Sequence, residues 1–132
     1  MCYRIPMEKT EEEWRRELSA EEYRVLREHG TEAPFSGAYV DNHEKGVYRC
    51  KACGAALFGS DAKFDSGTGW PSFTDPTIAE QVGTRLDPDG QRTEVFCKNC
   101  SGHLGHVFDD GPQDKGGKRY CINSVCLNFE RT

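Results

Sequence analysis

The sequences CKACG at residues 50–54 and CKNCSG at residues 97–102 decide the fold of this chain. Each contains two cysteines separated by two residues. This spacing lets both sulfurs point at one ion, while the glycines permit tight turns. Two such pairs can supply four thiolates to one tetrahedral Zn²⁺ and leave no position for water. We therefore expect one structural zinc ion per chain, with the ligands Cys50, Cys53, Cys97 and Cys100.

A redox-active cysteine pair is the alternative interpretation of a C-x-x-C motif. One motif alone would leave that alternative open, whereas two motifs in one small domain favour a metal. If the ion binds, part of the free energy of folding depends on it.

The length and charge of the chain limit its class. Its 132 residues fit a single domain over residues 1–132, with residues 1–9 as a flexible N-terminal arm. The formal net charge of −5 argues against a nucleic acid partner, because phosphate binding needs a basic surface. The sequence has no apolar run near the roughly 20 residues that span a bilayer, and no apolar secretory segment at its N-terminus. We expect a cytoplasmic monomer that does not enter a membrane.

The pattern along the chain predicts two short helices followed by short strands. Residues 10–29 contain two capping boxes, Thr10 with Glu13 and Ser19 with Glu22, and Gly30 is suited to end the second helix. Beyond residue 34 the chain is rich in glycine and turn residues, which is typical of a small, mainly β fold. The expected strands cover residues 46–50, 93–97, 106–108 and 120–129, with turns at residues 87–90 and 109–112.

Four ligands out of seven cysteines leave Cys2, Cys121 and Cys126. Cys121 follows Lys118 and Arg119, whose charges favour a thiolate. Asn123 lies two residues further on, so on a strand it faces the same side as Cys121. Taken alone, a cysteine on a strand is more often a small buried apolar residue than a nucleophile.

Three further motifs change that interpretation of Cys121. They are FDSGTGWPSF at residues 64–73, SGHLGHVFDDGP at residues 101–112 and RYCINS at residues 119–124. Together with the paired C-x-x-C motifs they closely resemble the methionine-R-sulfoxide reductases, the B type of methionine sulfoxide reductase. The resemblance includes the N-terminal helices, residues 34–37 and residues 46–50, and it runs from about residue 11 to residue 130.

The resemblance implies a fold and an activity. The family's fold consists of two small antiparallel sheets with short N-terminal helices, of the β-tent or Mss4-like type, with a four-cysteine zinc site. Its substrate is the R epimer of methionine sulfoxide, free or within oxidised proteins that it repairs. The cysteine matching Cys121 attacks the sulfoxide sulfur, releases methionine and becomes a sulfenic acid. Another thiol then reduces the sulfenic acid, and thioredoxin or another thiol reductant completes the cycle.

The chemistry of a sulfoxide indicates which side chains must surround the nucleophile. Its oxygen is a poor leaving group until it is protonated, so the site needs a thiolate together with acids and hydrogen-bond donors. The candidate donors are His103, His106 and Asn123. The charge of Arg119 can assist them. Trp70 and Phe108 are candidate substrate contacts, with Trp70 as an aromatic wall for the S-methyl group. The alternative for the two histidines is a structural role beside the second C-x-x-C motif.

The sequence departs from the family at the position of the second thiol. Many members carry the resolving cysteine in a Gly-Cys-Gly-Trp segment, and Thr68 stands there in this chain. Cys126 is a poor substitute. Five residues of strand span about 16 Å and point the two side chains to opposite faces, whereas a disulfide needs Cα atoms within roughly 7 Å. Cys2, on a mobile arm, can reach the pocket as a resolving cysteine. Direct reduction by an external thiol is the alternative.

Two other functions compete with the reductase. A zinc-ribbon module can bind a partner without catalysis, because a fold does not fix a function. A peroxide-sensing thiol switch would oxidise Cys121 without turnover. Cys121, Asn123 and the histidine pair favour the enzyme, since a pure binding module has no need of them.

Overall fold

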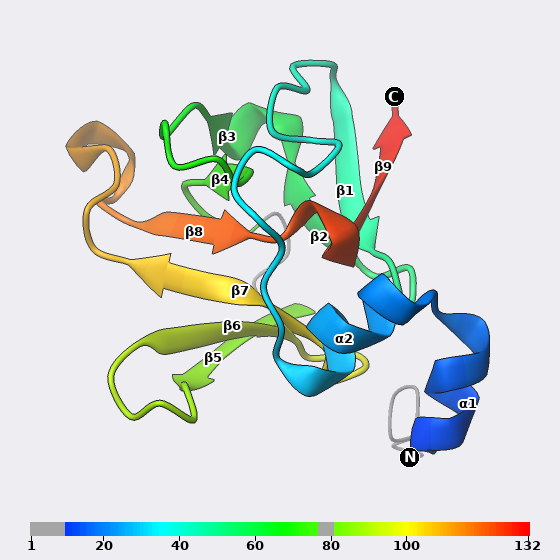
Figure 1. Cartoon of the computed structure of the whole chain (residues 1–132). Helices are drawn as coiled ribbons and strands as arrows, with labels where there is room; N and C mark the ends of the chain where they lie inside the picture. Colours follow the sequence, from blue (N-terminus) through cyan, green and yellow to red (C-terminus); the bar gives the residue numbers. More distant parts are fainter. Residues whose placement is uncertain (1–9, 77–80) are drawn as a thin grey trace, which may run out of the picture.

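A computed structural model describes residues 10–76 and 81–132 of the chain. This part contains two α-helices, which precede nine β-strands (Figure 1). The helices are α1 (Glu11–Glu17) and α2 (Ala20–Glu28). The strands are β1 (Gly46–Cys50), β2 (Ala56–Gly59), β3 (Lys63–Phe64), β4 (Ser72–Phe73), β5 (Val82–Leu86), β6 (Thr93–Cys97), β7 (His103–Phe108), β8 (Arg119–Ile122) and β9 (Leu127–Arg131).

The strands form two antiparallel sheets. One sheet has three strands in the order β2-β1-β9, and the other has six in the order β3-β4-β8-β7-β6-β5. The strands expected at residues 46–50 and 93–97 are β1 and β6, and β7 begins at His103 rather than at residue 106. The predicted mainly β fold with two antiparallel sheets and two N-terminal helices is therefore confirmed.

Aromatic side chains fill the space between the two sheets. Phe58 stacks on Phe73 with ring centroids 4.4 Å apart, and Tyr48 lies 4.8 Å from Phe129 and 5.2 Å from Phe73. Tyr48, Phe58 and Phe73 are fully buried. Phe73 belongs to the six-stranded sheet and the other three to the three-stranded sheet, so this aromatic core joins the two.

The N-terminal helices form where the capping residues predict. Thr10 and Ser19 each accept a hydrogen bond from the backbone N–H of the glutamate three residues later, and both reciprocal bonds are present. The second helix ends at Glu28, and His29 follows in the left-handed conformation, one residue before the expected stop at Gly30. Leu26 is buried on the face of α2 that meets β7.

The single strand expected over residues 120–129 is wrong. The chain leaves the six-stranded sheet after β8, turns through a 3₁₀ helix at Ser124–Cys126, and enters the three-stranded sheet as β9. The carboxylate of Glu32 causes the turn, because it accepts the backbone N–H groups of Ser124 at 2.8 Å and Val125 at 3.0 Å. One short segment therefore contributes a strand to each sheet, and Cys126 lies in a turn rather than on a strand.

Candidate active site and metal centre

The four cysteines of the two C-x-x-C motifs meet in the core. The Sγ atoms of Cys50 and Cys100 are 3.7 Å apart, those of Cys53 and Cys97 are 3.6 Å apart, and all four lie within 4.8 Å of one another. Zn–S bonds of about 2.3 Å in a tetrahedron place the sulfurs roughly 3.8 Å apart. The cluster therefore fits one zinc-sized ion, as the spacing predicts.

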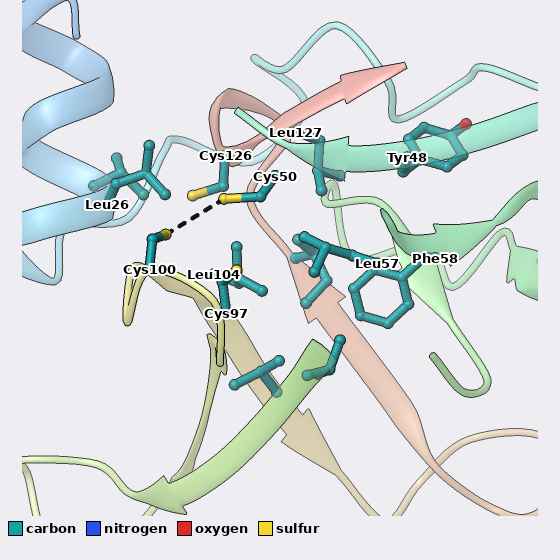
Figure 2. Close-up of a cluster of buried hydrophobic side chains, with 14 of the residues drawn as sticks. Leu26, Tyr48, Cys50, Leu57, Phe58, Cys97, Cys100, Leu104, Cys126 and Leu127 are labelled. Atoms are coloured by element: carbon teal, nitrogen blue, oxygen red, sulfur yellow. Dashed lines mark hydrogen bonds between the residues drawn. The ribbon is translucent and has the colours of Figure 1, made fainter. Parts of the chain in front are cut away.

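The cluster connects the two sheets. Cys50 is the last residue of β1 in the three-stranded sheet, and Cys97 is the last residue of β6 in the six-stranded sheet. Each turn closes on the strand end: Gly54 donates its N–H to the oxygen of Cys50 and Ser101 donates to that of Cys97. In Figure 2, Cys50 and Cys100 face each other beside Leu26 of α2. A bound ion would thus fasten the two sheets together.

A separate cavity of about 220 Å³ contains Cys121. It is lined by residues from the connection before β1, the β3–β4 loop, the β5–β6 turn and strands β7 and β8. They are Thr31, Thr68, Trp70, Arg92, Gly105, His106, Phe108, Arg119, Cys121 and Asn123. Six of the predicted site residues therefore share one cavity, and His103 is not part of its lining.

The pairing of β7 with β8 aligns the centre of this cavity. His106 lies directly opposite Cys121, and Phe108 lies opposite Arg119. Directly opposed residues point to the same face with Cβ atoms about 4.5–5.5 Å apart. Gly105 permits the approach, because a Cβ there would collide with the backbone oxygen of Cys121.

The electrostatics of Cys121 differ from the sequence-based expectation. Burial raises the pKa of this thiol, whereas the charge of Arg119 and hydrogen bonds with Thr68 and Arg119 lower it, and the net pKa lies above its ordinary value. Arg119 is itself paired with Asp110 at 2.8 Å, and Lys118 with Asp109 at 2.6 Å. The two cations therefore do not produce a thiolate at rest, because burial outweighs the effect of Arg119.

Arg119 also carries an aromatic contact. Its guanidinium lies 4.5 Å from the centre of the Phe108 ring, and its side chain is largely buried. Two hydrogen bonds to the carboxylate of Asp110, at 2.8 and 3.1 Å, fix the guanidinium beside that ring. Phe108 and Arg119 together form one wall of the cavity.

His106 is oriented by a residue that sequence reasoning missed. Its Nε2 lies 2.7 Å from the Oδ1 atom of Asp87, in the predicted turn at residues 87–90. Burial acts to raise the pKa of Asp87, but the N–H of Asp89 and the His106 ring outweigh it, so the pKa is lowered. The carboxylate can only accept, hence Nε2 carries the proton and Nδ1 is the free nitrogen.

His103 lies behind His106, outside the cavity. Its side chain is 1% exposed, Nδ1 is 2.8 Å from the carboxylate of Glu94, and the buried Nε2 has no hydrogen-bond partner among residues 10–76 and 81–132. A bulge in the β6–β7 pairing adds Leu104 between the histidines and keeps both rings on one side, with centroids 5.4 Å apart. Burial lowers the pKa of His103, which favours a neutral ring.

Asn123 and Trp70 are held by the connection that precedes β1. Asn123 accepts the N–H of Glu32 at 3.0 Å and donates to the oxygen of Leu104 at 3.0 Å. Trp70 donates its indole N–H to the oxygen of Glu32 at 3.0 Å. Asn123 shares the cavity with Cys121 as expected, although it lies just beyond the end of β8.

Cys126 lies apart from the cavity lining. Cys126 is fully buried, as expected. It donates its thiol to the oxygen of His103 and lies near Cys50 in Figure 2. Cys2 lies outside the described residues. Thr68 stands in the cavity beside Cys121, where its hydroxyl is hydrogen-bonded to that of Ser66 at 2.8 Å. No signal in the sequence linked the missed residues Thr31, Asp87 and Arg92 to Cys121.

The fold and the site define a class of protein. It is a small, mainly β protein whose two sheets meet at a four-cysteine cluster that could hold a metal ion, with a further cysteine in a separate cavity. No helix in residues 10–76 and 81–132 is long and apolar enough to cross a membrane.

Comparison with known proteins identifies the family. The SelR domain matches residues 18–131, and the chain belongs to this family. Three curated relatives are each named peptide methionine sulfoxide reductase MsrB. That of Methanosarcina barkeri is 57% identical over 94% of this chain and 88% of its own length. Those of Thiobacillus denitrificans and Bradyrhizobium diazoefficiens are each 58% identical over 92% of this chain, and over 92% and 88% of their own lengths. The chain is therefore an enzyme of the peptide methionine sulfoxide reductase family.

One solved structure is only distantly similar. The crystal structure of the Mis18 "Yippee-like" domain covers 67% of this chain and 98% of its own, at 19% identity and a TM-score of 0.49. This likeness is too low to bear on function.

Proposed function

We propose that this chain reduces methionine-R-sulfoxide to methionine, with Cys121 as the nucleophile. The pairing of Cys121 with His106 across β7 and β8, inside a cavity bounded by Trp70 and Phe108, carries this proposal. A sulfoxide side chain combines an apolar S-methyl group with a strongly accepting oxygen. It therefore needs an aromatic wall and a proton donor on opposite sides.

The first step transfers oxygen from the substrate to the enzyme. The thiol of Cys121 loses its proton to Nδ1 of His106, and the sulfur attacks the sulfoxide sulfur. The imidazolium of His106 protonates the sulfoxide oxygen, and the S–O bond of the substrate breaks as this oxygen leaves as hydroxide. The oxygen then adds to the sulfur of Cys121 while the S–S bond between Cys121 and the substrate breaks, so that methionine leaves with the electron pair and Cys121 becomes a sulfenic acid. Asp87 stabilises the transient imidazolium through its contact with Nε2. Because the pKa of Cys121 is raised, the thiol brings the proton that the oxygen needs.

The second stage removes the sulfenic acid. A thiol attacks the sulfur of Cys121, water leaves, and the resulting disulfide is reduced by thioredoxin or another thiol reductant. Thr68 cannot form a disulfide, and Cys126 is buried in the core. The attacking thiol therefore comes from outside the described residues, either from the reductant or from Cys2.

The four cysteines would hold one Zn²⁺ with a structural role. All four positions of a tetrahedron are taken by Cys50, Cys53, Cys97 and Cys100, so the ion would stabilise the fold rather than bind substrate. His103 would support His106 from behind, and Asn123 would hold the floor of the cavity.

Stereospecific turnover tests this proposal. Dabsylated methionine-R-sulfoxide and its S epimer are each incubated with the protein and dithiothreitol, and the sulfide is measured by chromatography. Conversion of the R epimer only is expected. A protein that converts neither epimer, yet binds partners through the cysteine cluster, would be a non-catalytic binding module. Stable oxidation of Cys121 by peroxide without turnover would instead indicate a thiol switch.

A further inference from the structure

Three hydroxyl groups form a hydrogen-bonded chain beside Cys121. The hydroxyl of Ser72 donates to the backbone oxygen of Trp70 at 3.1 Å, and it lies 2.7 Å from the hydroxyl of Ser66. Ser66 in turn lies 2.8 Å from the hydroxyl of Thr68. Thr68 lines the cavity of Cys121, and its hydroxyl is hydrogen-bonded with the Cys121 thiol. We call Ser72, Ser66 and Thr68 the hydroxyl chain.

Strand pairing places the hydroxyl chain on one side of Cys121 and His106 on the other. Strand β8 lies between β4 and β7 (Figure 1). Ser72 of β4 is directly opposite Cys121, and so is His106 of β7. Directly opposed residues point to the same face of a sheet. Ser72 is fully buried, so its hydroxyl depends on protein partners rather than on solvent.

The carbonyl at the end of the hydroxyl chain fixes the direction of every hydrogen bond in it. A hydroxyl has a single hydrogen to donate, and a carbonyl oxygen can only accept. Ser72 gives its hydrogen to the oxygen of Trp70, so it must accept from Ser66. Ser66 has then used its own hydrogen, so it must accept from Thr68. Toward Cys121, Thr68 has only a lone pair to offer, and at rest it accepts the hydrogen of the thiol.

This direction suits the thiol but not the thiolate. A thiolate needs donors, because hydrogen bonds to the charged form stabilise it. Reversal of the hydroxyl chain supplies one: each hydroxyl rotates about its C–O bond, Ser72 releases its carbonyl acceptor, and Thr68 turns its hydrogen to the sulfur. No proton leaves the three hydroxyls, because the proton of the thiol goes to His106. The reversal exchanges a neutral hydrogen bond for a stronger one to a charged group.

We propose that the hydroxyl chain makes Thr68 a reversible partner of the nucleophile, an acceptor for the thiol of Cys121 at rest and a donor to its thiolate during turnover. Thr68 is then a further catalytic residue, and Ser66 and Ser72 are positioning residues that act through it. This inference rests on the proposed function, in which Cys121 is the nucleophile. Position 68 has no resolving thiol in this chain, and its hydroxyl serves the first stage of the reaction instead.

Alkylation of Cys121 by iodoacetamide tests the hydroxyl chain without any sulfoxide. The rate at Cys121 is measured by peptide mass spectrometry between about pH 7 and pH 10. Thr68→Val removes the donor to the thiolate, so at pH 8 the rate should fall about 3- to 5-fold; the higher basicity of the remaining thiolate offsets part of the loss. The difference should shrink as the pH approaches 10, which an obstructed cavity would not produce. Thr68→Ser, which keeps a hydroxyl, should react like the wild type.

Ser66→Ala distinguishes the hydroxyl chain from a merely structural role. Without Ser66, the hydrogen of Thr68 can point at Cys121 and no other hydrogen bond has to break. Alkylation at pH 8 should therefore become about 2- to 3-fold faster, opposite in sign to the effect of Thr68→Val. Thr74→Val is the matched control, because the hydroxyl of Thr74 follows β4 and donates to the oxygen of Ala62 at 3.4 Å, outside the cavity lining. It should leave the alkylation rate unchanged.

Methionine release in a single turnover tests the role of Thr68 as a donor. Free methionine-R-sulfoxide is added without reductant, and methionine is measured over time. Thr68→Val should slow its release about 5- to 10-fold, because the developing charge on the sulfur loses a hydrogen bond. Thr68→Ser should retain the wild-type rate.

Three outcomes would overturn the proposal. Slower alkylation in both Thr68→Val and Ser66→Ala would show that the hydroxyls only hold the loop before β4. An unchanged rate in Thr68→Val would show that this hydroxyl does not act on the sulfur. A loss in Thr74→Val as large as that in Thr68→Val would assign the effect to a loosened strand. Failure of the proposed function is distinct, because it would abolish methionine release by the wild type and leave the alkylation rates in the expected order.

Discussion

The two cysteine sites of this protein are built in opposite ways. The four-cysteine cluster comes from two tight turns, each encoded within a few residues and each closed by its own backbone hydrogen bond. The Cys121 cavity is assembled from residues of several separate segments, and its aligning contacts are made across strands and loops. A local motif is therefore enough to bring four potential metal ligands together, whereas the cavity around Cys121 depends on the completed fold.

Replacing one cluster cysteine is the most severe way to test this contrast. Cys97→Ser should lose the metal and its cooperative thermal unfolding, because a structural zinc ion contributes on the order of 10 kcal/mol to small metal-dependent domains. Elemental analysis and calorimetry measure the two effects. Cys126→Ser is the control, since this cysteine is equally buried but belongs to neither C-x-x-C pair. A metal-free Cys97→Ser protein with a normal melting curve would contradict the structural role.

Replacing Cys121 should change turnover without changing the metal content or stability that depend on the four-cysteine cluster. Cys121→Ser should lose at least about 10³-fold in turnover, because a hydroxyl is a far weaker nucleophile than a thiol at neutral pH. Its metal content and melting temperature should stay close to those of the wild type, because Cys121 lies outside the cluster. Activity above a tenth of the wild-type value would exclude Cys121 as the nucleophile.

Substitution of Asp87 tests whether turnover depends on a residue that acts through its contact with His106. Asp87→Asn should lower kcat about 10- to 100-fold, because it removes the charge that stabilises the protonated form of His106. The pH dependence of kcat should also differ between Asp87→Asn and the wild type. Asp89→Asn is the matched control, because Asp89 belongs to the same turn but holds Arg92 rather than His106. An identical pH profile in Asp87→Asn and wild type would contradict the positioning role.

A smaller effect, on the reactivity of the Cys121 thiol, is expected from removing the positive charge of Arg119. The pKa of this thiol is raised, so its thiolate fraction should increase with pH through the neutral range and still be incomplete at pH 8. Arg119→Gln removes a cation that lowers this pKa, and should slow alkylation of Cys121 by iodoacetamide about 3- to 10-fold at pH 8. Peptide mass spectrometry measures the rate at Cys121. Lys118→Gln, whose lysine is paired with Asp109, should leave the rate unchanged.

The smallest change in turnover is expected from a variant that affects the second stage of the reaction, the removal of the sulfenic acid. One equivalent of methionine-R-sulfoxide without reductant, followed by dimedone, should label Cys121 and leave Cys2 free if an external thiol reduces the sulfenic acid directly. Cys2→Ser should then leave thioredoxin-dependent turnover almost unchanged. A Cys2–Cys121 disulfide, or slower thioredoxin-dependent turnover in Cys2→Ser, would identify Cys2 as the resolving thiol instead. A rapid Cys121–Cys126 disulfide would contradict the burial of Cys126.

The same contrast explains what the sequence could predict. The helices, β1, β6 and the cluster were predicted correctly, because capping residues, turn residues and C-x-x-C spacing act over a few residues. The strand expected at residues 120–129 was wrong because Glu32, distant in sequence, turns the chain there. The contact of Asp87 with His106 was not foreseen for the same reason. The placement of His103 depends on a β-bulge in the pairing of β6 with β7, and the residues His103 and His106 do not predict this bulge.

The pairing of β1 with β9 also sets an order of assembly during synthesis. Gly46 lies opposite Arg131, so the three-stranded sheet cannot close until β9 has left the ribosome. All four cluster cysteines emerge earlier, before Cys121 and the turn that follows it. The C-terminal segment that contains Cys121 therefore completes both sheets, because β8 pairs with β4 and β7, and β9 pairs with β1.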